Sequence, residues 1–481
     1  MKHTYILHTY GKNVNTPFWF FFIGYFLIMI APSFLTEGMF LDGIIYSEIA
    51  SNMAEGRGSF WDPYMNHIFF PHFREHPPLA LGLNSLLYRI FGDHLIIDKI
   101  YSFLTIVVAA LLIVAIWKRT TNGSRLSWFP LLLWSLIPLV TWSSTNNVLE
   151  NTMSIFVLLS VFIAIIGIQK HNNIFFILSG IFLFLAFLTK GFTGLFPLIF
   201  VIIYDFFFRE RNIKQTIVSF LLVLFGLLGS YFILDLISPN FSEYIIRYFN
   251  KQVVGSIENV TTVSSRFFIV WRLIQEILVA LILLVVISVI HRFAKRNFFV
   301  SNERDDDFKW FLVFLLLGLS GVLPIMISMK QSGFYMLTAL PFFGLSFAHL
   351  YRKTLQSLLS NITNKVYNRV LGFSLIILMV GVGLNIYFAG KYGRDEVFLK
   401  DMKTVINEVG CENIISITKK DCNLFGWYSY FSRYGDVGLD SKNIHEYLLT
   451  SDPEYLYEFN LQDKYIPVDI ETKSMFLYKM R

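Results

Sequence analysis

Ionisable residues lie beside long apolar segments at several places in this 481-residue sequence. Charged groups are costly within or beside a membrane-crossing segment, so such residues are functional candidates by default. A carboxylate, an imidazole and several cations could together bind an anionic head group and activate a hydroxyl. The residues in question are Asp42, Tyr46, Arg74, Glu75, His76, Glu150, Lys190, Lys330 and Tyr335.

Asp42 follows the first apolar segment and is followed in turn by Tyr46. A carboxylate held at the edge of a bilayer is partly desolvated and can act as a general base toward a hydroxyl. The alternative is an ordinary loop aspartate, or one that caps the helix that follows.

Arg74, Glu75 and His76 stand directly before two prolines that are expected to open a helix. An acid, an imidazole and a guanidinium at a helix N-terminus could bind a phosphate, and Glu75 with His76 could hold a divalent metal. The alternative is a solvated turn.

Lys190, in "LTKGFTG", lies between two apolar segments with almost no loop around it, and Lys330 and Tyr335 mark another turn. These lysines could face a lipid phosphate, or they could be interfacial anchors. Gly191 and Gly194 permit close backbone approach beside Lys190. Glu150 opens a further span, where a first-turn acid is the simpler interpretation.

The composition predicts a polytopic helical membrane protein. Hydrophobic residues make up 55% of the chain and charged residues 15%, which does not suit a soluble fold. The net charge of +6 accompanies no nucleic-acid motif, so we interpret it as a topology signal. We expect about eleven spans, with thirteen as the upper bound, at residues 18–35, 98–117, 127–142, 150–168, 174–189, 192–208, 215–237, 268–291, 309–329, 333–351 and 369–389.

Basic residues gather in alternate loops, among them 118–125, 209–214, 291–297 and 351–356. By the positive-inside rule these loops and the N-terminus, with Lys2 and Lys12, are cytoplasmic. An odd number of spans then places the C-terminal tail outside. All the candidate residues fall on the same, outer side, which favours a site at the outer leaflet.

Two outward segments stand apart, at residues 36–97 and 390–481. The first contains helix-like runs at 43–53 and 79–92, which we expect to lie on the membrane surface. The second follows a transmembrane domain of residues 1–389, and we expect it to form a small extracytoplasmic α/β domain. Its pattern predicts a helix at 402–410 and a strand at 413–418. A third outward loop, 238–267, is expected to be partly helical. Cys411 and Cys422 could form a disulfide, although two free buried thiols are the preferred interpretation.

Four motifs in order resemble the GT-C glycosyltransferases, and more narrowly the bacterial relatives of protein O-mannosyltransferases and lipid A aminoarabinose transferases. The motifs are Asp-Gly-x-x-Tyr (42–46), Glu-His-Pro-Pro-Leu (75–79), Leu-Thr-Lys-Gly-x-x-Gly (188–194) and Lys-x-x-x-x-Tyr with a following Leu-Pro (330–341). The resemblance implies a polyprenyl-phosphate sugar donor, a hydroxyl-bearing acceptor (lipid A, another glycan, a lipid or a protein) and transfer at the outer face of the bacterial inner membrane.

The resemblance also implies roles for residues. Asp42 would be the base or the carboxylate that orients the acceptor, and Glu75 would support the site. Lys190, Lys330, Tyr335 and Arg74 or His76 would bind the donor phosphate, while Tyr46 and Glu150 would line the site. The family often has Asp-Glu where this chain has Asp42-Gly43, and Glu-Lys-Pro where it has Glu75-His76-Pro77, which loosens the acidic pair and replaces a permanent cation by a titrating one.

Two other functions remain open at this point. A transporter or flippase of a lipid-linked sugar would be expected to show inverted repeats and charges near the midplane. A membrane scaffold that presents the tail domain would not depend on Asp42 or Lys190. The sequence does not specify the sugar, the acceptor, a cofactor or the oligomeric state.

Overall fold

The computed structural model describes residues 14–255, 261–294, 306–360, 362–458, 461 and 463–481. Lys2, Lys12 and part of the 291–297 loop lie outside the described residues. The chain forms two compact units, each assembled from segments that are distant in sequence. The first unit comprises Met1–Ala31, Ser102–Ser144 and Leu149–Tyr387. The second comprises Pro32–Tyr101, Thr145–Val148 and Phe388–Arg481.

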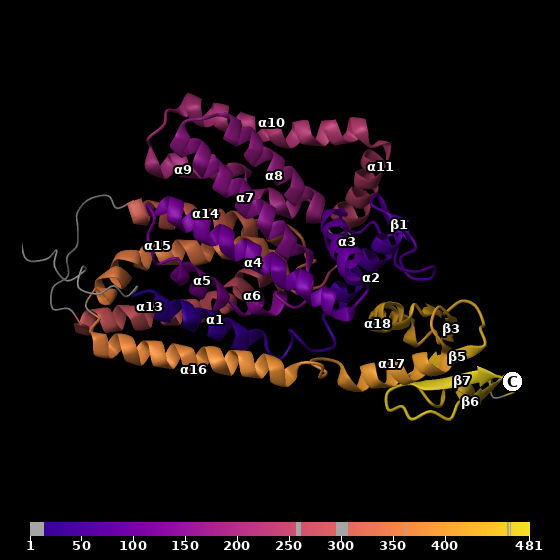
Figure 1. Ribbon diagram of the computed structural model, residues 1–481. Coiled ribbons are helices and arrows are strands. Elements are labelled where there is room, and N and C mark those ends of the chain that lie inside the picture. The colour runs from indigo at the N-terminus through magenta and orange to yellow at the C-terminus, as the bar shows by residue number, and fades with distance from the viewer. Residues whose placement is uncertain (1–13, 256–260, 295–305, 361, 459–460, 462) are drawn as a thin grey trace, which may run out of the picture. The chain divides into compact units, whose positions relative to one another are not determined.

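Helices build the first unit (Figure 1). Its α-helices are α1 (Thr16–Ile30), most of α4 (Leu95–Thr120), α5 (Trp128–Ser135), α6 (Pro138–Ser143), α7 (Leu149–Lys170), α8 (Ile174–Lys190), α9 (Phe200–Phe208), α10 (Ile213–Ile237), α11 (Pro239–Tyr248), α13 (Phe268–Ala294), α14 (Asp306–Val322), α15 (Leu340–Leu359) and α16 (Asn364–Phe388). Shorter helical turns connect them: η1 (Phe192–Ile199), η2 (Phe249–Val254), η3 (Leu323–Ile327) and η4 (Gly333–Ala339).

Seven helical segments within the described residues are long and apolar enough to cross a membrane, as the composition predicts. Each of the eleven expected spans coincides with helical structure. Four of them are short or interrupted: α1, α8, η1 with α9, and the pair α5–α6, which breaks before Pro138. A count of eleven crossings therefore stays a prediction, while the helical membrane architecture is confirmed.

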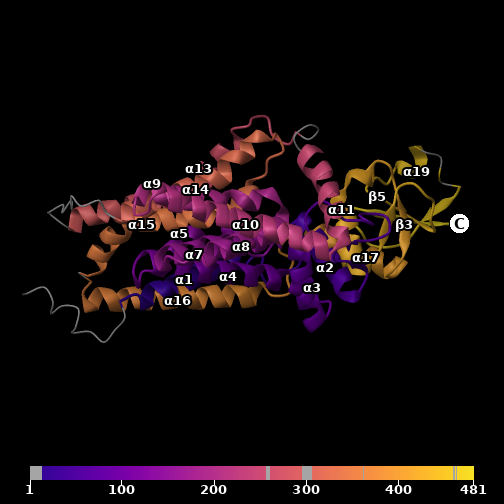
Figure 2. The same cartoon turned by 90° about the horizontal axis from the view of Figure 1, so that it is seen from above.

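Glycines bring α8 and α10 into close contact, and Figures 1 and 2 both show these helices side by side with α7. A Cβ atom on Gly180 would lie 2.0 Å from the carbonyl oxygen of Val223, and one on Gly226 would lie 2.1 Å from that of Ile177. Small residues allow this approach between membrane helices. The contact fixes the helix that ends at Lys190.

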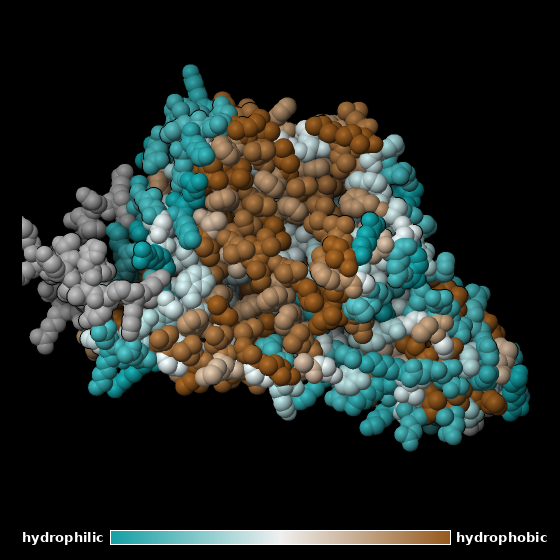
Figure 3. Space-filling view, in the orientation of Figure 1, coloured by the Kyte–Doolittle hydropathy of each residue, from teal (hydrophilic) through white to brown (hydrophobic). Residues whose placement is uncertain are grey.

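Apolar side chains cover the outside of the first unit, as the brown residues over its helices show (Figure 3). Leu236 on α10, Phe293 on α13 and Ile386 on α16 are 85%, 86% and 70% exposed. An apolar surface this extensive is unstable in water and suits lipid.

The second unit begins with two helices, α2 (Leu41–Glu55) and α3 (Leu79–Phe91), which pack against one another around a short hairpin of β1 (Gly58–Ser59) and β2 (Asp62–Pro63). Both helices were predicted. Residues Gly43–Met53 of α2 are buried on every side, however, so this helix lacks the exposed face that a helix on a membrane surface would have. The apolar side chains of Leu86, Ile90 and Phe91 are exposed on α3, whose surface position stays a prediction.

A mixed α/β fold completes the second unit, as predicted. Its sheet has the order β4-β3-β5-β7-β6, with β3 parallel to β4 and β5, and β7 antiparallel to β5 and β6. The strands are β3 (Ile414–Ile417), β4 (Gly438–Asp440), β5 (Tyr447–Thr450), β6 (Tyr465–Pro467) and β7 (Phe476–Met480), and the helices are α17 (Glu396–Val409), α18 (Phe425–Gly435) and α19 (Tyr455–Glu458). Buried side chains such as Met402, Phe431 and Leu477 form the core.

Several local predictions are confirmed in these elements. The strand at 413–418 is β3, the helix ending at a glycine is α17 with Gly410 after it, and the 238–267 loop contains α11. Cys411 and Cys422 are free, but Cys411 is exposed and Cys422 half-buried, so the expectation of buried thiols is wrong. The domain boundary at residues 389 and 390 stays a prediction.

Candidate active site

Asp42 lies in the first turn of α2 and is half-buried. Phe40 occupies the N-cap position, so Asp42 is not the capping residue that the alternative interpretation required. A carboxylate in the first turn interacts favourably with the helix dipole. The backbone N–H of Phe40 donates to Oδ1 of Asn146 at 2.8 Å and so anchors the start of the helix.

The glycine after Asp42 has a steric cause. A Cβ atom on Gly43 would lie 2.1 Å from the carbonyl oxygen of Asn146, which is backbone and cannot swing aside. Asn147 makes a second contact nearby, where its Nδ2 donates to Oγ of Ser47 at 2.7 Å. The segment 145–148 therefore packs directly on α2 and leaves no room for the glutamate that often follows the aspartate in the resembled family.

Tyr46 and His76 lie beside one another. Tyr46 follows Asp42 by four residues, so both project from one face of α2. The Tyr46 ring is buried and meets the His76 ring edge-on, with centroids 6.0 Å apart, while Phe73 contacts both. Glu75 and His76 occupy the turn before Pro78, which caps α3, so the prolines do introduce a helix as predicted. Asp42 and Tyr46 thus share a face of α2, and Tyr46 contacts His76.

Arg74 is directed toward the β1–β2 hairpin. Its Nη2 forms an ion pair with Oδ1 of Asp62 at 3.1 Å, and Nδ1 of His72 lies 3.0 Å from the same carboxylate. To bind the donor phosphate, the guanidinium of Arg74 would have to contact it while still paired with Asp62, or break that ion pair.

Lys190 ends α8 and is buried, with its Nζ 2.5 Å from Oε1 of Glu150 in the first turn of α7. The ammonium also lies 5.1 Å from the ring centroid of Phe334 and 5.3 Å from that of Tyr335. Aromatic faces stabilise a cation that has lost water. Lys190, Glu150 and Tyr335 therefore form a second group. The sequence singled out each of these residues but did not predict that they contact one another.

Gly191 allows the chain to turn immediately after Lys190. Its φ of +86° favours glycine, and a Cβ atom there would lie 1.9 Å from the hydroxyl of Tyr248. The Tyr248 hydroxyl donates to the carbonyl oxygen of Lys190 at 3.3 Å. The predicted close approach at this glycine is confirmed, and α11 is the element that approaches.

Lys330 lies in the turn between η3 and η4, and its Nζ donates to Oε1 of Gln252 at 3.1 Å. Gln331 is buried and holds this turn through bonds to the Ile269 N–H and the Arg266 carbonyl. Lys330 thus lies just before η4, the helical turn that carries Tyr335, while its side chain reaches η2.

A charge cluster centred on the buried Arg433 of the second unit was missed. Arg433 of α18 contacts Asp93 at 2.7 Å and Asp98 at 3.1 Å, and lies 4.0 Å from Glu48 of α2. Oε1 of Glu48 accepts from Oγ of Ser432 at 3.0 Å, while burial raises the pKa of Glu48 to about 7 against the opposing charge of Arg433. The signal in the sequence was a lone glutamate within an otherwise apolar and small-residue run.

Metal binding was considered for Glu75 and His76. Within the described part of the chain, no three His, Cys, Asp or Glu side chains lie close enough together to hold a metal ion. Structural and catalytic metal sites commonly use at least three protein ligands. These two residues would therefore need further ligands from a bound substrate or from water.

The fold and these groups define a class: a polytopic helical membrane protein with an α/β unit, resembling the GT-C glycosyltransferases. Residues 75–239 match the family model described as dolichyl-phosphate-mannose-protein mannosyltransferase. No curated protein matches the sequence.

Solved structures share the fold over most of the chain. ArnT from Cupriavidus metallidurans bound to undecaprenyl phosphate has a TM-score of 0.65 at 13% identity, covering 96% of this chain and 97% of that chain. Its apo structure has a TM-score of 0.62 at 13% identity, with coverages of 94% and 95%. The Archaeoglobus fulgidus oligosaccharyltransferase in the apo form has a TM-score of 0.50 at 11% identity, covering 89% and 65%. The resemblance to the GT-C membrane glycosyltransferases is confirmed.

Proposed function

We propose that this protein transfers a sugar from a polyprenyl-phosphate donor to a hydroxyl acceptor, with inversion, at the outer face of a bacterial inner membrane. The observation that carries the proposal is the likeness of the whole chain to ArnT, a protein whose structure is bound to undecaprenyl phosphate. The match of residues 75–239 to the mannosyltransferase family model supports the same reaction class. The comparisons give no support to the flippase alternative.

In the proposed reaction Asp42 accepts the proton of the acceptor hydroxyl as its oxygen attacks the anomeric carbon. The bond between that carbon and the phosphate oxygen breaks, and the polyprenyl phosphate leaves with the electron pair. A single displacement inverts the configuration at the anomeric carbon. Tyr46 and His76, which lie beside one another near the Asp42 face of α2, would line the acceptor side, with Glu75 in support.

The leaving phosphate needs cations. Lys190 carries three donors, and the bond to Glu150 uses one of them. We assign Lys190 to the donor phosphate, with Lys330, the Tyr335 hydroxyl, Arg74 and His76 as further contacts, and Glu150 as the residue that orients Lys190. The topology that this requires has a cytoplasmic N-terminus and a periplasmic C-terminal domain.

The donor assignment is tested by mass spectrometry of lipids that co-purify with the protein. The wild type is expected to carry polyprenyl phosphate. The amount bound to Lys190→Gln should be lower by about tenfold or more, because a charge-assisted contact is lost. Lys214→Gln removes an exposed lysine from the first turn of α10 and is the matched control. A wild-type protein that carries no polyprenyl phosphate, even after addition of the lipid, would contradict the assignment.

The base assignment is tested by Asp42→Asn, reconstituted in vesicles with radiolabelled polyprenyl-phosphate sugars and an envelope extract as the acceptor source. Transfer should be lost while the protein stays folded. Asp469→Asn, at an exposed position of the α/β part, should transfer normally. Retained transfer by Asp42→Asn would remove Asp42 from the mechanism.

A further inference from the structure

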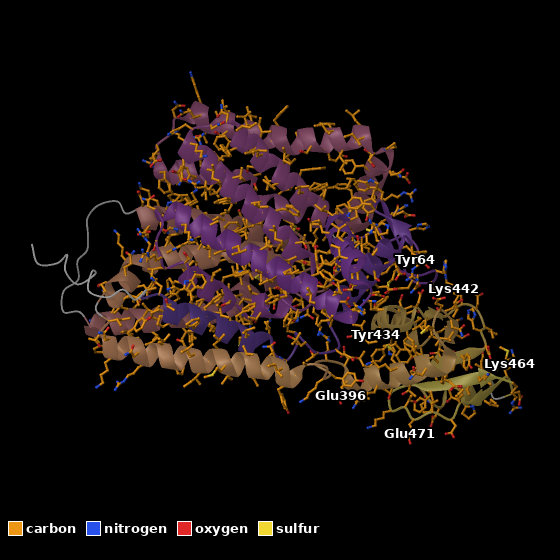
Figure 4. The ribbon with its side chains drawn as sticks, in the orientation of Figure 1. Tyr64, Glu396, Tyr434, Lys442, Lys464 and Glu471 are labelled. Atoms are coloured by element: carbon orange, nitrogen blue, oxygen red, sulfur yellow. The ribbon has the colours of Figure 1, made fainter. Side chains whose placement is uncertain are left out.

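A polar cleft of about 620 Å³ lies within the second unit. Residues of the first outer segment, including Glu48, Tyr64 and Asn66, line it together with residues of the α/β part, including Asn413, Tyr434 and Asp436. Figure 4 labels Tyr64, which follows β2, and Tyr434, which belongs to α18. The proposed reaction does not use this cleft.

One lining residue offers a buried hydrogen-bond donor without a partner. Asn66 is 4% exposed, and its Oδ1 accepts from the backbone N–H groups of Ile68 at 2.9 Å and Phe69 at 2.6 Å. These two bonds fix the orientation of the amide. Its Nδ2 has no partner among the residues that the structure describes. A buried donor of this kind is costly unless water or a ligand satisfies it.

The charge of the cleft disfavours anions. Four carboxylates line it, from Glu55, Asp93, Glu412 and Asp436, with the acid Glu48, against the two guanidiniums of Arg57 and Arg433. Both guanidiniums are already paired with carboxylates: Arg57 with Glu55 at 2.8 Å and with Asp436, and Arg433 with Asp93 and Asp98. A phosphorylated ligand would meet the remaining negative charge.

Carboxylates, amides and tyrosines together suit an uncharged, hydroxyl-rich ligand. Carboxylate oxygens accept from hydroxyl groups, and amide N–H groups donate to them. Tyrosine rings combine an apolar face with a polar tip, which matches the two faces of a sugar ring. Glu412 and Asn413 border the cleft at the start of β3 and supply both types of group.

We propose that this cleft binds an uncharged carbohydrate chain. Its identity as a part of the acceptor remote from the reacting hydroxyl rests on the proposed function. Asp42 and Glu48 are six residues apart on α2, so they project about 120° apart around the helix. The cleft and the proposed base therefore lie on different faces of one helix. Binding of remote parts of a substrate supplies energy that an enzyme can use in catalysis.

Cys411 gives a direct reporter, because it lines the cleft and is exposed. In full-length protein carrying Cys422→Ser, alkylation of Cys411 by a maleimide is timed with and without added oligosaccharide. The probes are a panel of uncharged tri- to hexasaccharides of glucose, mannose, galactose and N-acetylglucosamine, and the same chains carrying a terminal phosphate. At least one uncharged chain is expected to slow alkylation several-fold at millimolar concentration, and its phosphorylated form is expected to protect less.

Asn66→Asp is nearly isosteric and keeps the oxygen that holds the Ile68 and Phe69 N–H groups, but removes the unpartnered donor. It should raise the half-protecting concentration about tenfold. Asn407→Asp adds the same charge at an exposed position of α17, outside the cleft, and should leave protection unchanged. Tyr64→Ala gives a second, charge-free change with the same expected direction.

The proposal is overturned if no uncharged chain in the panel protects Cys411, or if the phosphorylated chains protect equally well. It is also overturned if the same oligosaccharide protects Cys411 in Asn66→Asp and in Tyr64→Ala as well as it does without these substitutions. Protection of Cys411 by Ca²⁺ or Mg²⁺ alone would overturn it too. The assay contains no sugar donor and measures no transfer. Protection in the Asp42→Asn protein therefore tests the cleft, whereas loss or retention of transfer in that protein tests the proposed reaction.

Discussion

Lys190 and Glu150 form a buried ion pair that joins the last turn of α8 to the first turn of α7, with 2.5 Å between Nζ and Oε1. Their side chains are 7% and 1% exposed, so neither charge is well solvated. The proposed phosphate-binding lysine therefore cannot be removed without leaving an acid buried inside the protein.

Lys190→Met should destabilise the protein by about 3–5 kcal/mol, because Glu150 would remain buried without its partner. Glu150→Gln in the same chain should recover most of that loss, while donor binding stays reduced because the cation is still missing. Thermal unfolding in detergent measures the first effect and co-purified lipid the second. A double variant no more stable than Lys190→Met would show that the pair does not determine stability.

Gly43→Ala should destabilise the start of α2 by about 1–3 kcal/mol, because the new Cβ would overlap the Asn146 carbonyl. Loss of sugar transfer should accompany it, since Asp42 would move with the helix. Gly426→Ala, on α18, adds a Cβ atom with nothing within 4 Å and should be neutral or slightly stabilising. Thermal unfolding of the two variants compares them directly, and equal midpoints would refute the steric argument.

Arg433→Met should destabilise the second unit by about 3–5 kcal/mol, because Asp93, Asp98 and Glu48 would lose their shared cation. Arg394→Met removes a half-exposed arginine that pairs with Asp395, and should change stability by less than about 1 kcal/mol. Limited proteolysis of the C-terminal region reports the difference. If both variants resist protease equally, the cluster contributes little to the fold.

Glu48 should make the stability depend on pH. Burial raises its pKa from 4.5 to about 7 in the folded protein, so the folded state holds a proton that the unfolded state releases in this range. Its contribution to stability is full below about pH 4.5 and is lost as the pH rises through 7, by roughly 3 kcal/mol in total. Glu48→Gln should remove this slope. Unfolding free energies measured between pH 5 and 8 test it, and parallel curves for the two proteins would contradict the assignment.

Local patterns in the sequence were sufficient for the individual elements. Each expected span coincides with helical structure because apolar length is a local property that a bilayer selects. The strand β3 and the helix that ends before Gly410 follow from equally local signals. The surface position expected for 43–53 stays a prediction, and α2 has no exposed face because other parts of the chain bury its polar residues as well.

The residue types of the candidate site were also readable from the sequence, since an acid or a lysine in an apolar run stands out wherever it folds. Their partners were decided by the tertiary structure alone. Glu150 and Lys190 are 40 residues apart, and Glu48 and Ser432 are 384 apart, yet each pair is in hydrogen-bond contact. Such contacts form only when two helices pack at a particular distance and relative rotation. That packing depends on many weak contacts spread over the chain, such as those at the glycines of α8 and α10, and no local sequence pattern encodes it.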